Sequence, residues 1–306
     1  MNILITGGLG HIGSHFIDSI NKIKKINQIY VIDNNSNNRI NSLFNFKKKN
    51  INLILDDACN QKCFKRIKHK IDIIIHLAYT KNAEASIKNK KKVYNNNFGS
   101  FKNITQYAKK NSCKLIHISS TSVYGSQEKI IGESCKDLKP QSPYADVKLL
   151  EEKYLRKINN FSYISLRFGT IVGYLMGMRF HTAVNKFCFN AINYKPITVW
   201  ETAMDQFRPY LSLSDAFIVL KYIIENKYFD NKIHNVLSNN YTVRQIISLI
   251  KKHNKTVRIK YTNSKIMNQL SYKVINETGL LKKIRLKNEI HSDIKNIFFA
   301  FKNIVY

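Results

Sequence analysis

A tyrosine and a lysine stand four residues apart in the segment PQSPYADVKLL, residues 140–150. Ser142 is a good helix N-cap and Pro143 a good first helical residue, so the segment predicts a helix that begins there. On that helix Tyr144 and Lys148 share one face. The lysine would favour the phenolate form of the tyrosine, which could then act as an acid or base near neutral pH. The pair could also be an ordinary surface pair on an amphipathic helix, so the rest of the chain must decide.

The segment ITGGLGHIGSH follows the first apolar run and carries Gly7, Gly10 and Gly13 at intervals of three. Glycine permits a tight turn and lets the backbone approach a pyrophosphate, which then lies on the N-terminus of the following helix. Asp33 ends the next apolar run, 20 residues beyond Gly13. A carboxylate at this place would bind the adenosine ribose hydroxyls and repel the extra phosphate of NADP. These features together predict an NAD site.

The segment HISSTSVYG, residues 117–125, is a cluster of hydroxyl side chains at the end of a predicted strand, where ligands bind in parallel sheets. Its Ser120 precedes Tyr144 by 24 residues. Taken alone, the cluster could be an ordinary polar loop. It follows the glycine turn and Asp33 and precedes the tyrosine–lysine pair, and this order argues against coincidence.

Short apolar runs rich in Ile, Leu and Val alternate with helix-length segments, as expected for parallel strands that are buried on both faces. The predicted strands are 2–6, 28–32, 51–55, 71–78, 114–119, 162–168, 196–200 and 232–237, and the predicted helices are 12–25, 60–69, 98–111, 143–158, 181–193, 214–226, 242–253 and 288–302. We therefore predict an α/β fold, a doubly wound parallel sheet with a smaller C-terminal substrate domain. Residues 1–168 would form the NAD-binding domain, to which 208–237 return, and 169–306 would mainly form the substrate domain.

The composition excludes several classes of protein. Apolar residues make up 44% of the 306 residues and are spread along the chain, as in a globular protein. No apolar run approaches the roughly 18 residues that span a bilayer, and no basic region precedes the first strand as in a signal peptide. We therefore expect a cytoplasmic protein without a membrane partner. The five cysteines are scattered and indicate neither a metal site nor a disulfide framework.

The formal net charge of +30 suggests a nucleic-acid partner. However, 41 of the 50 basic residues are lysines, scattered among many Asn and Ile residues, which indicates compositional bias. Lysine runs at 47–49 and 88–92 fall where loops or helix ends are expected and are typical of solvated charge. We therefore expect no nucleic-acid partner, although the charge could still attract an anionic substrate.

In this order the motifs resemble the extended short-chain dehydrogenase/reductase family, specifically its branch of nucleotide-sugar epimerases and dehydratases, which includes UDP-glucose 4-epimerase-like proteins. The resemblance covers nearly the whole chain. After Lys148 it continues in LRFGTIVG (166–173), MRFHTAVNKF (178–187), RPYLSLSDA (208–216) and HNVLSNNYTVRQI (234–246).

The resemblance implies roles for individual residues. Tyr144 would be the catalytic acid and base, Ser120 would assist it, and Lys148 would hold both the phenolate and the nicotinamide ribose. The implied NAD-binding residues are Gly7, Gly10, His11, Ile12, Gly13, Asp33, Asn34, Asn35, Ser36, Asp57, Ala58, Leu77, Ala78, Tyr79, Asn96, Tyr144 and Lys148. The implied substrate residues are Thr80, Thr121, Ser122, Thr170, Arg179, Asn185 and Arg208, with Arg208 binding the diphosphate of a sugar nucleotide.

The chain departs from the family mainly at the substrate end. Dehydratases of this branch carry an Asp-Glu pair directly after the catalytic hydroxyl residue, whereas this chain has Thr121 and Ser122 and so lacks the acid and base of that elimination. Thr170 stands where the family usually has Asn. Arg179 and Asn185 could cap a helix rather than bind a ligand.

We therefore expect an NAD-dependent epimerase of a nucleotide sugar, acting at C4 through a transient 4-keto intermediate. A nucleotide-sugar oxidoreductase, either a keto-sugar reductase or a dehydrogenase, would need the same three catalytic residues. A non-catalytic NAD- or nucleic-acid-binding module is the alternative from another class, but such a module needs no acid/base pair. The resemblance also implies a homodimer in which the helices at 98–111 and 143–158 form a four-helix contact.

Overall fold

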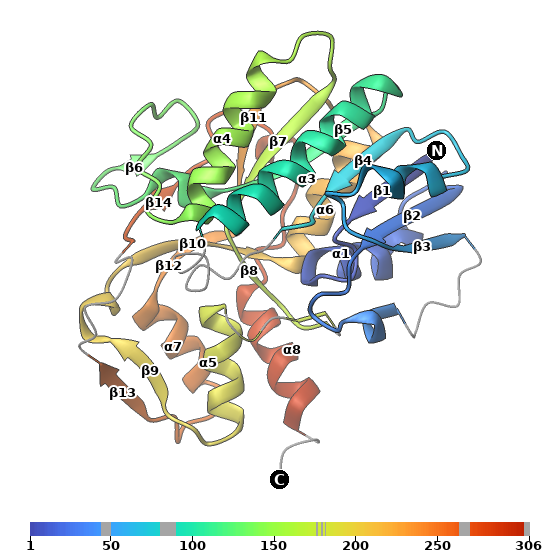
Figure 1. The fold of residues 1–306 in the computed structure, drawn as a ribbon. Coiled ribbons are helices and arrows are strands. Elements are labelled where there is room, and N and C mark those ends of the chain that lie inside the picture. Colours follow the sequence, from blue (N-terminus) through green and yellow to red (C-terminus); the bar gives the residue numbers. More distant parts are fainter. Residues whose placement is uncertain are drawn as a thin grey trace.

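The computed structural model describes residues 1–43, 50–79, 90–175, 177–178, 180, 182–262 and 270–302. Its centre is a seven-stranded sheet in the order β11–β7–β5–β4–β1–β2–β3, with all strands parallel (Figure 1). The strands are β1 (Asn2–Thr6), β2 (Gln28–Asp33), β3 (Ile51–Leu55), β4 (Ile73–His76), β5 (Lys114–Ser120), β7 (Tyr163–Phe168) and β11 (Ile233–Val236). The strand order reverses between β1 and β4, which opens a crevice at the carboxyl ends of these strands. The predicted α/β parallel fold is confirmed.

Helices cover both faces of this sheet (Figure 1). The inward residues Ile3 and Ile5 of β1 pack in a core that includes α1 (His11–Ser19) and α6 (Leu213–Glu225). Leu4, between them, faces the opposite core, to which α3 (Lys90–Lys110) and α4 (Pro143–Lys157) contribute. Burial on both faces explains why these strands have continuous apolar runs instead of alternating ones.

A second group of elements lies below the carboxyl edge of the sheet (Figure 1). It contains α5 (Ala183–Ile192), α7 (Val243–Lys251) and α8 (Ile290–Lys302), together with β9 (Ile197–Trp200) and β13 (Ile259–Thr262), which pair in parallel. A separate apolar core joins these helices. Two small sheets complete the fold, one of β8 (Thr170–Val172), β10 (Phe207–Ser212) and β12 (Asn239–Thr242), and one of β6 (Ile130–Ile131) and β14 (Lys273–Val274).

Three predicted helices differ from those observed. The helix expected at 12–25 ends at Ser19, where a 3-10 turn follows and Ile23 becomes extended to bury its side chain. The segment at 60–69 forms only a 3-10 helix, Gln61–Arg66, because it offers just two buried anchors, Cys63 and Phe64. The helix expected at 98–111 begins earlier, at Lys90, in a stretch without apolar periodicity.

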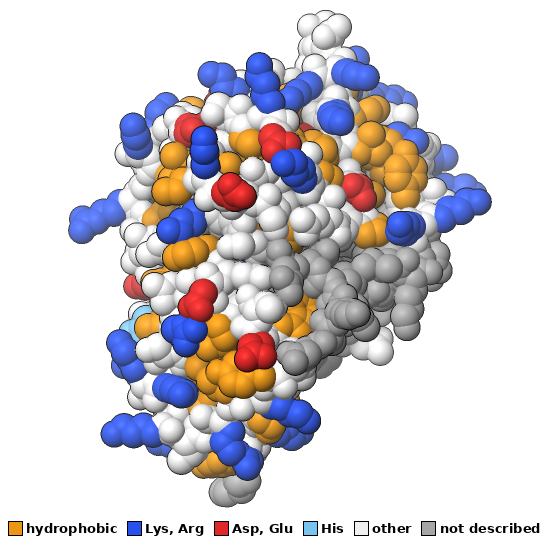
Figure 2. Space-filling view, turned by 90° about the vertical axis from the view of Figure 1, so that its left-hand side faces the viewer, with side chains coloured by type: hydrophobic (Ala, Val, Ile, Leu, Met, Phe, Trp, Pro, Cys, Tyr) orange, Lys and Arg blue, Asp and Glu red, His pale blue; other side chains and the backbone are white. Residues whose placement is uncertain are grey.

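None of the helices in the described part of the chain combines the length and apolar character that a membrane crossing requires. All five cysteines are free thiols. Lys and Arg side chains are spread over the face shown in Figure 2, with acidic and apolar side chains between them, and do not gather in one stripe. On this face the charge therefore lacks the form of a nucleic-acid-binding groove.

Candidate active site

The glycine-rich turn lies between β1 and α1 and is packed too tightly for side chains. Gly7 has a φ of +70°, and a Cβ atom there would lie 2.6 Å from the backbone of Leu77 and Ala78. A Cβ atom on Gly13 would lie 2.6 Å from the Cα atom of Gly8. No side chain caps α1 at Gly10, its N-cap residue. The first N–H groups of such a helix form a natural site for a phosphate.

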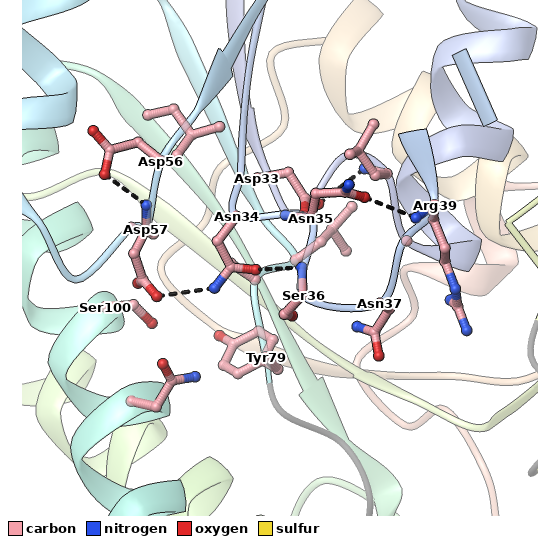
Figure 3. A pocket seen from close by; sticks show the side chains of 18 residues that line it. Asp33, Asn34, Asn35, Ser36, Asn37, Arg39, Asp56, Asp57, Tyr79 and Ser100 are labelled. Atoms are coloured by element: carbon pink, nitrogen blue, oxygen red, sulfur yellow. Dashed lines mark hydrogen bonds between the residues drawn. The ribbon is translucent and has the colours of Figure 1, made fainter. Parts of the chain in front are cut away.

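A pocket of about 250 Å³ opens beside this turn (Figure 3). It lies at the carboxyl ends of β1, β2, β3 and β4 and reaches the side of α3. Its lining residues are Gly7, Leu9, Gly10, Ile32, Asp33, Asn34, Asn35, Ser36, Asn37, Arg39, Asp56, Asp57, Ala58, Leu77, Ala78, Tyr79, Asn96 and Ser100. Twelve residues predicted for NAD from the sequence are therefore brought together: Gly7, Gly10, Asp33, Asn34, Asn35, Ser36, Asp57, Ala58, Leu77, Ala78, Tyr79 and Asn96.

Backbone donors orient the carboxylate at the end of β2. Asp33 accepts hydrogen bonds from the N–H of Leu9 at 3.1 Å and that of Asn35 at 2.8 Å. Burial raises the pKa of Asp33 above its ordinary value, although these hydrogen bonds oppose the shift. Beside it, the Asn34 amide donates to Asp57 at 2.9 Å (Figure 3). The carboxylate retains acceptor positions for ligand hydroxyls, since it can accept about four hydrogen bonds.

His11 and Ile12, like Gly13, Tyr144 and Lys148, are predicted NAD residues that are not part of the pocket lining. The His11 ring lies 2.9 Å from the carbonyl oxygen of Gly173, and Ile12 packs into the core under the sheet. Both are buried and do not line the pocket. Sequence reasoning missed Arg39, which lines the pocket and donates to the carbonyl of Gly177 at 3.0 Å. The signal that could have identified Arg39 in the sequence is a basic residue shortly after Asp33, the last residue of β2.

Ser120 and Tyr144 lie at the junction of β5 and α4. Ser142 caps α4 by accepting from the Ala145 N–H at 3.2 Å, and Pro143 begins the helix, as predicted. Ser120 ends β5, and its hydroxyl accepts hydrogen bonds from the Ser122 N–H at 3.2 Å and the Ser122 hydroxyl at 2.9 Å. These bonds use its acceptor positions, so the Ser120 O–H can itself act as a donor toward a ligand oxygen.

Lys148 points from the inward face of α4 and is almost completely buried, with 1% of its side chain exposed. Its ammonium donates to the carbonyl of Ile118, in β5, at 2.6 Å and to Glu151 at 3.1 Å. It lies 5.8 Å from the centre of the Tyr144 ring and 2.8 Å from that of Tyr79. In the predicted tyrosine–lysine pair, Lys148 is therefore buried behind the partly exposed Tyr144, and the two do not form a fully exposed surface pair.

A buried ion pair anchors α4 to the sheet. Glu152 accepts two hydrogen bonds from the Arg167 guanidinium, at 2.8 and 2.6 Å, and a third from the Ser119 hydroxyl at 2.6 Å. Arg167 also donates to the Tyr124 hydroxyl at 2.7 Å. Planar two-point pairing of this kind fixes geometry as well as charge. It holds α4, the helix that carries Tyr144 and Lys148, against β5 and β7.

The predicted substrate residues are only partly brought together. Thr170 on β8 and Arg208 on β10 lie on neighbouring strands of one sheet, and both are partly exposed. Thr121 is buried, with its hydroxyl 3.3 Å from that of Tyr272 and 3.4 Å from the Phe168 carbonyl. Asn185 is also completely buried, on α5. Ser122 lies beside Ser120, and Thr80 and Arg179 lie outside the described residues.

The arrangement fits a bound NAD molecule. Gly7 and Gly13 let the turn pack closely against Leu77, Ala78 and Gly8. Gly10, the uncapped N-cap of α1, lines the pocket, where a pyrophosphate would approach the helix. Asp33 and Asp57 would bind the adenosine end in the pocket, and Lys148 contacts the ring of Tyr79, another lining residue. Among the residues that the structure describes, no group of three or more His, Cys, Asp or Glu side chains is placed to hold a metal ion.

The chain has sequence relatives among sugar-nucleotide enzymes. It is 32% identical to UDP-glucose 4-epimerase from Yersinia enterocolitica over 184 residues, which cover 56% of this chain and 54% of that protein. The same enzyme from Pasteurella multocida (strain Pm70) is 34% identical over 186 residues, with 56% and 54% covered. The chain thus spans about half the length of the curated relatives it matches.

Solved structures share the fold over the full length. UDP-N-acetylglucosamine 4-epimerase from Methanobrevibacter ruminantium M1 has a TM-score of 0.86, covers 99% of both chains and is 21% identical. DesIV, a dTDP-glucose 4,6-dehydratase from Streptomyces venezuelae, has a TM-score of 0.84, covers 100% of this chain and 99% of its own, and is 18% identical. Epimerases and dehydratases therefore share this shape, so shape alone does not separate the two activities.

The model of the NAD dependent epimerase/dehydratase family matches residues 3–237. The matched range contains the glycine turn, the pocket residue Asp33, and the Ser120, Tyr144 and Lys148 group. With this match, and with a site that fits the cofactor, the chain belongs to the NAD-dependent epimerase/dehydratase family of enzymes.

Proposed function

We propose that the protein is an NAD-dependent epimerase of a nucleotide sugar, which acts at C4 through a transient 4-keto intermediate. The observation that carries this proposal is the pair of residues after Ser120. Thr121 is buried and hydrogen-bonded to Tyr272, and the Ser122 hydroxyl is bonded to Ser120. Neither hydroxyl ionises near neutral pH, so the acid and base that eliminate water in a dehydratase are missing. Reversible oxidation at one carbon needs only Ser120, Tyr144 and Lys148.

Bound NAD would supply the hydride acceptor and donor of this reaction. Tyr144 would remove the proton from the sugar hydroxyl and later return it, while Ser120 donates a hydrogen bond to the same oxygen. The ammonium of Lys148 favours the phenolate because it lies 5.8 Å from the Tyr144 ring. The keto sugar would then turn within the pocket before it is reduced on its other face.

We further propose that the sugar nucleotide binds between the main sheet and the elements that follow residue 168. Arg208 on β10 would bind the diphosphate, with Thr170 on the neighbouring strand β8, and Ser122 would face the sugar. Thr80, Thr121, Arg179 and Asn185 remain predictions from the resemblance. The relatives named UDP-glucose 4-epimerase support a UDP-hexose as the first substrate to test.

The test uses purified protein without added cofactor. It is incubated with UDP-glucose, UDP-N-acetylglucosamine, UDP-glucuronic acid and GDP-, CDP- and dTDP-hexoses, while NMR follows the sugar and absorbance at 340 nm follows reduced cofactor. A new C4 epimer without net NADH, lost in Tyr144→Phe and kept in the exposed control Tyr261→Phe, supports the proposal. A second series includes added NAD(H). Stoichiometric consumption of that cofactor without an epimer would instead indicate a net oxidoreductase, and an unsaturated or deoxygenated product would indicate a dehydratase.

We also propose that the protein is a cytoplasmic homodimer. The helices α3 and α4 lie side by side on one face of the sheet (Figure 1). Tyr94 on α3 is 46% exposed there, and Leu149 and Leu150 on α4 are only partly buried. Pairing of two such surfaces would bury these side chains. Light scattering should give twice the mass of the chain, whereas a monomer at micromolar concentrations would contradict the proposal.

A further inference from the structure

A second buried carboxylate lies next to Lys148, behind the groups that carry the proposed chemistry. Glu151 follows Lys148 by three residues on α4, so both side chains project from the inward face of the helix. His117 reaches the same place from β5, and Ser165 from the neighbouring strand β7, where the two residues are partners in register. Lys148, Glu151, His117 and Ser165 are at most 1% exposed.

Three groups contact the same oxygen of Glu151, and a fourth contacts one of these three. Its Oε2 accepts from the Lys148 ammonium at 3.1 Å, lies 2.9 Å from His117 Nε2 and accepts from the Tyr79 hydroxyl at 3.3 Å. His117 Nδ1 lies 2.9 Å from the Ser165 hydroxyl. The other oxygen, Oε1, is buried and has no hydrogen-bond partner among the residues that the structure describes.

Among the described residues around Lys148, Glu151 is the one that serves as its counter-ion. Burial, with the positive Lys148 nearby, lowers the pKa of His117 far below its ordinary value, so this ring is neutral and can donate to the carboxylate. The same effects lower the pKa of His76. Glu152 lies one residue further on, but it is paired with Arg167.

Burial and pairing oppose each other at the lysine. Burial lowers the pKa of Lys148 to about 8, and the attraction of Glu151 works against this shift. Burial also raises the pKa of Glu151 to about 7, against the attraction of Lys148. A buried ion pair is weak evidence for stability, because apolar residues of similar size often serve the fold as well. The location of this pair, directly behind the proposed acid/base, indicates a role in chemistry.

We propose that Glu151, oriented by His117, is a positioning residue that keeps Lys148 protonated in its buried place and thereby keeps Tyr144 acidic enough to work near neutral pH. The proposal rests on the proposed role of Tyr144. A full positive charge at the distance from Lys148 to the Tyr144 ring, 5.8 Å, favours the phenolate by about two pH units at an effective dielectric constant of 20. Without Glu151, a buried amine would release its proton instead.

The test compares Glu151→Gln, which removes the charge at constant size, with Glu151→Asp, which keeps it. The first readout needs no substrate. Tyrosinate absorbance at 295 nm is followed against pH, and the step that belongs to Tyr144 is identified by its loss in Tyr144→Phe, since the chain has 17 tyrosines. The second readout is kcat against pH for whichever sugar nucleotide the protein converts. Glu225→Gln, on the distant helix α6, is the control.

The proposal expects Glu151→Gln to move the Tyr144 step and the acid limb of kcat upward by about one to two pH units, so that kcat at pH 7 falls about tenfold or more and recovers at high pH. Glu151→Asp and Glu225→Gln should stay near the wild type. A Tyr144 step that does not move, or moves downward, overturns the proposal. So does a kcat that falls equally at every pH, because that is the sign of a merely structural role.

Failure of this inference can be distinguished from failure of the proposed function. If the absorbance step moves as expected but no sugar nucleotide is epimerised, the role of Glu151 holds and the epimerase proposal fails. If an epimer forms and the step stays in place, the epimerase proposal holds and the role of Glu151 fails.

Discussion

Replacing Gly7 with alanine should damage the protein more than any other substitution of a similar size in the β1–α1 turn. Gly7 has a φ of +70°, which L-residues avoid, and the new Cβ atom would lie 2.6 Å from the Leu77 carbonyl and the Ala78 nitrogen. Left-handed backbone costs a residue with a Cβ about 1–2 kcal/mol. Crowding a packed site adds about 1–3 kcal/mol. Here the neighbours are backbone atoms of the β4 end, which cannot rotate away.

Gly279→Ala is the matched control for this substitution. Gly279 has a φ of +79°, yet nothing lies within 4 Å of the position its Cβ atom would take. Gly279→Ala should therefore lower the free energy of unfolding only by the cost of the left-handed backbone, about 1–2 kcal/mol. Both variants restrict the unfolded chain equally, so that effect cancels in the comparison. Gly7→Ala should therefore lose about 1–3 kcal/mol more stability than Gly279→Ala, which is the cost of crowding the backbone of Leu77 and Ala78.

The assay is urea unfolding at constant temperature, followed both by far-UV circular dichroism and by the fluorescence of the single tryptophan, Trp200. Coincident transitions would justify comparing free energies of unfolding. NAD affinity, measured on the folded proteins by calorimetry, should fall in Gly7→Ala and stay unchanged in Gly279→Ala. Equal losses of stability in the two variants would refute the reasoning, because they would show that the turn moves away from Leu77 and Ala78 without cost.

Two further predictions concern buried charge. Glu152→Gln should lower the free energy of unfolding by about 3–5 kcal/mol, because Arg167 would keep a buried charge without its partner. Urea unfolding is the measurement, and the control Asp205→Asn should show little change because its ion pair is exposed. Equal losses of stability in the two variants would contradict the prediction. Burial raises the pKa of Asp293 to about 7, with Asp215 adding to the shift. The native state therefore holds this proton more tightly than the unfolded chain, and stability should fall as pH rises from about 4 to 7. Asp293→Asn should remove that slope and raise stability at pH 8 by up to about 4 kcal/mol, and an unchanged slope in thermal unfolding scans would contradict it.

Features with a local cause could be predicted from the sequence. The apolar runs of β1 and β3 match their observed bounds. In β1 the cause is burial on both faces, which needs such a run. Ser142 and Pro143 mark the start of α4 because capping depends on adjacent residues. Asp33 lines the pocket because a strand end, a glycine turn and a helix start are close in the chain.

Features that depend on distant residues could not be predicted. The short strands β8, β10 and β12 form one sheet from three separate parts of the chain, and each spans only three to six residues. Arg39 reaches the pocket because its side chain spans to Gly177, a contact between residues 138 positions apart. At 60–69 a polar, helix-length segment forms a short 3-10 helix, because few of its side chains find a core to pack against.

Glu151 and Glu152 show most clearly what the sequence hides. The two are adjacent and chemically identical, and on an α-helix with basic residues nearby both would be assigned to solvent. The structure buries both and gives them different partners, Lys148 and Arg167. Arginine cannot release its proton in a protein, whereas a buried lysine can. Loss of Glu152 should therefore appear as lost stability at every pH above the carboxylate range. Loss of Glu151 should appear as a displaced pH profile with stability largely kept, because Lys148 escapes the penalty by becoming neutral.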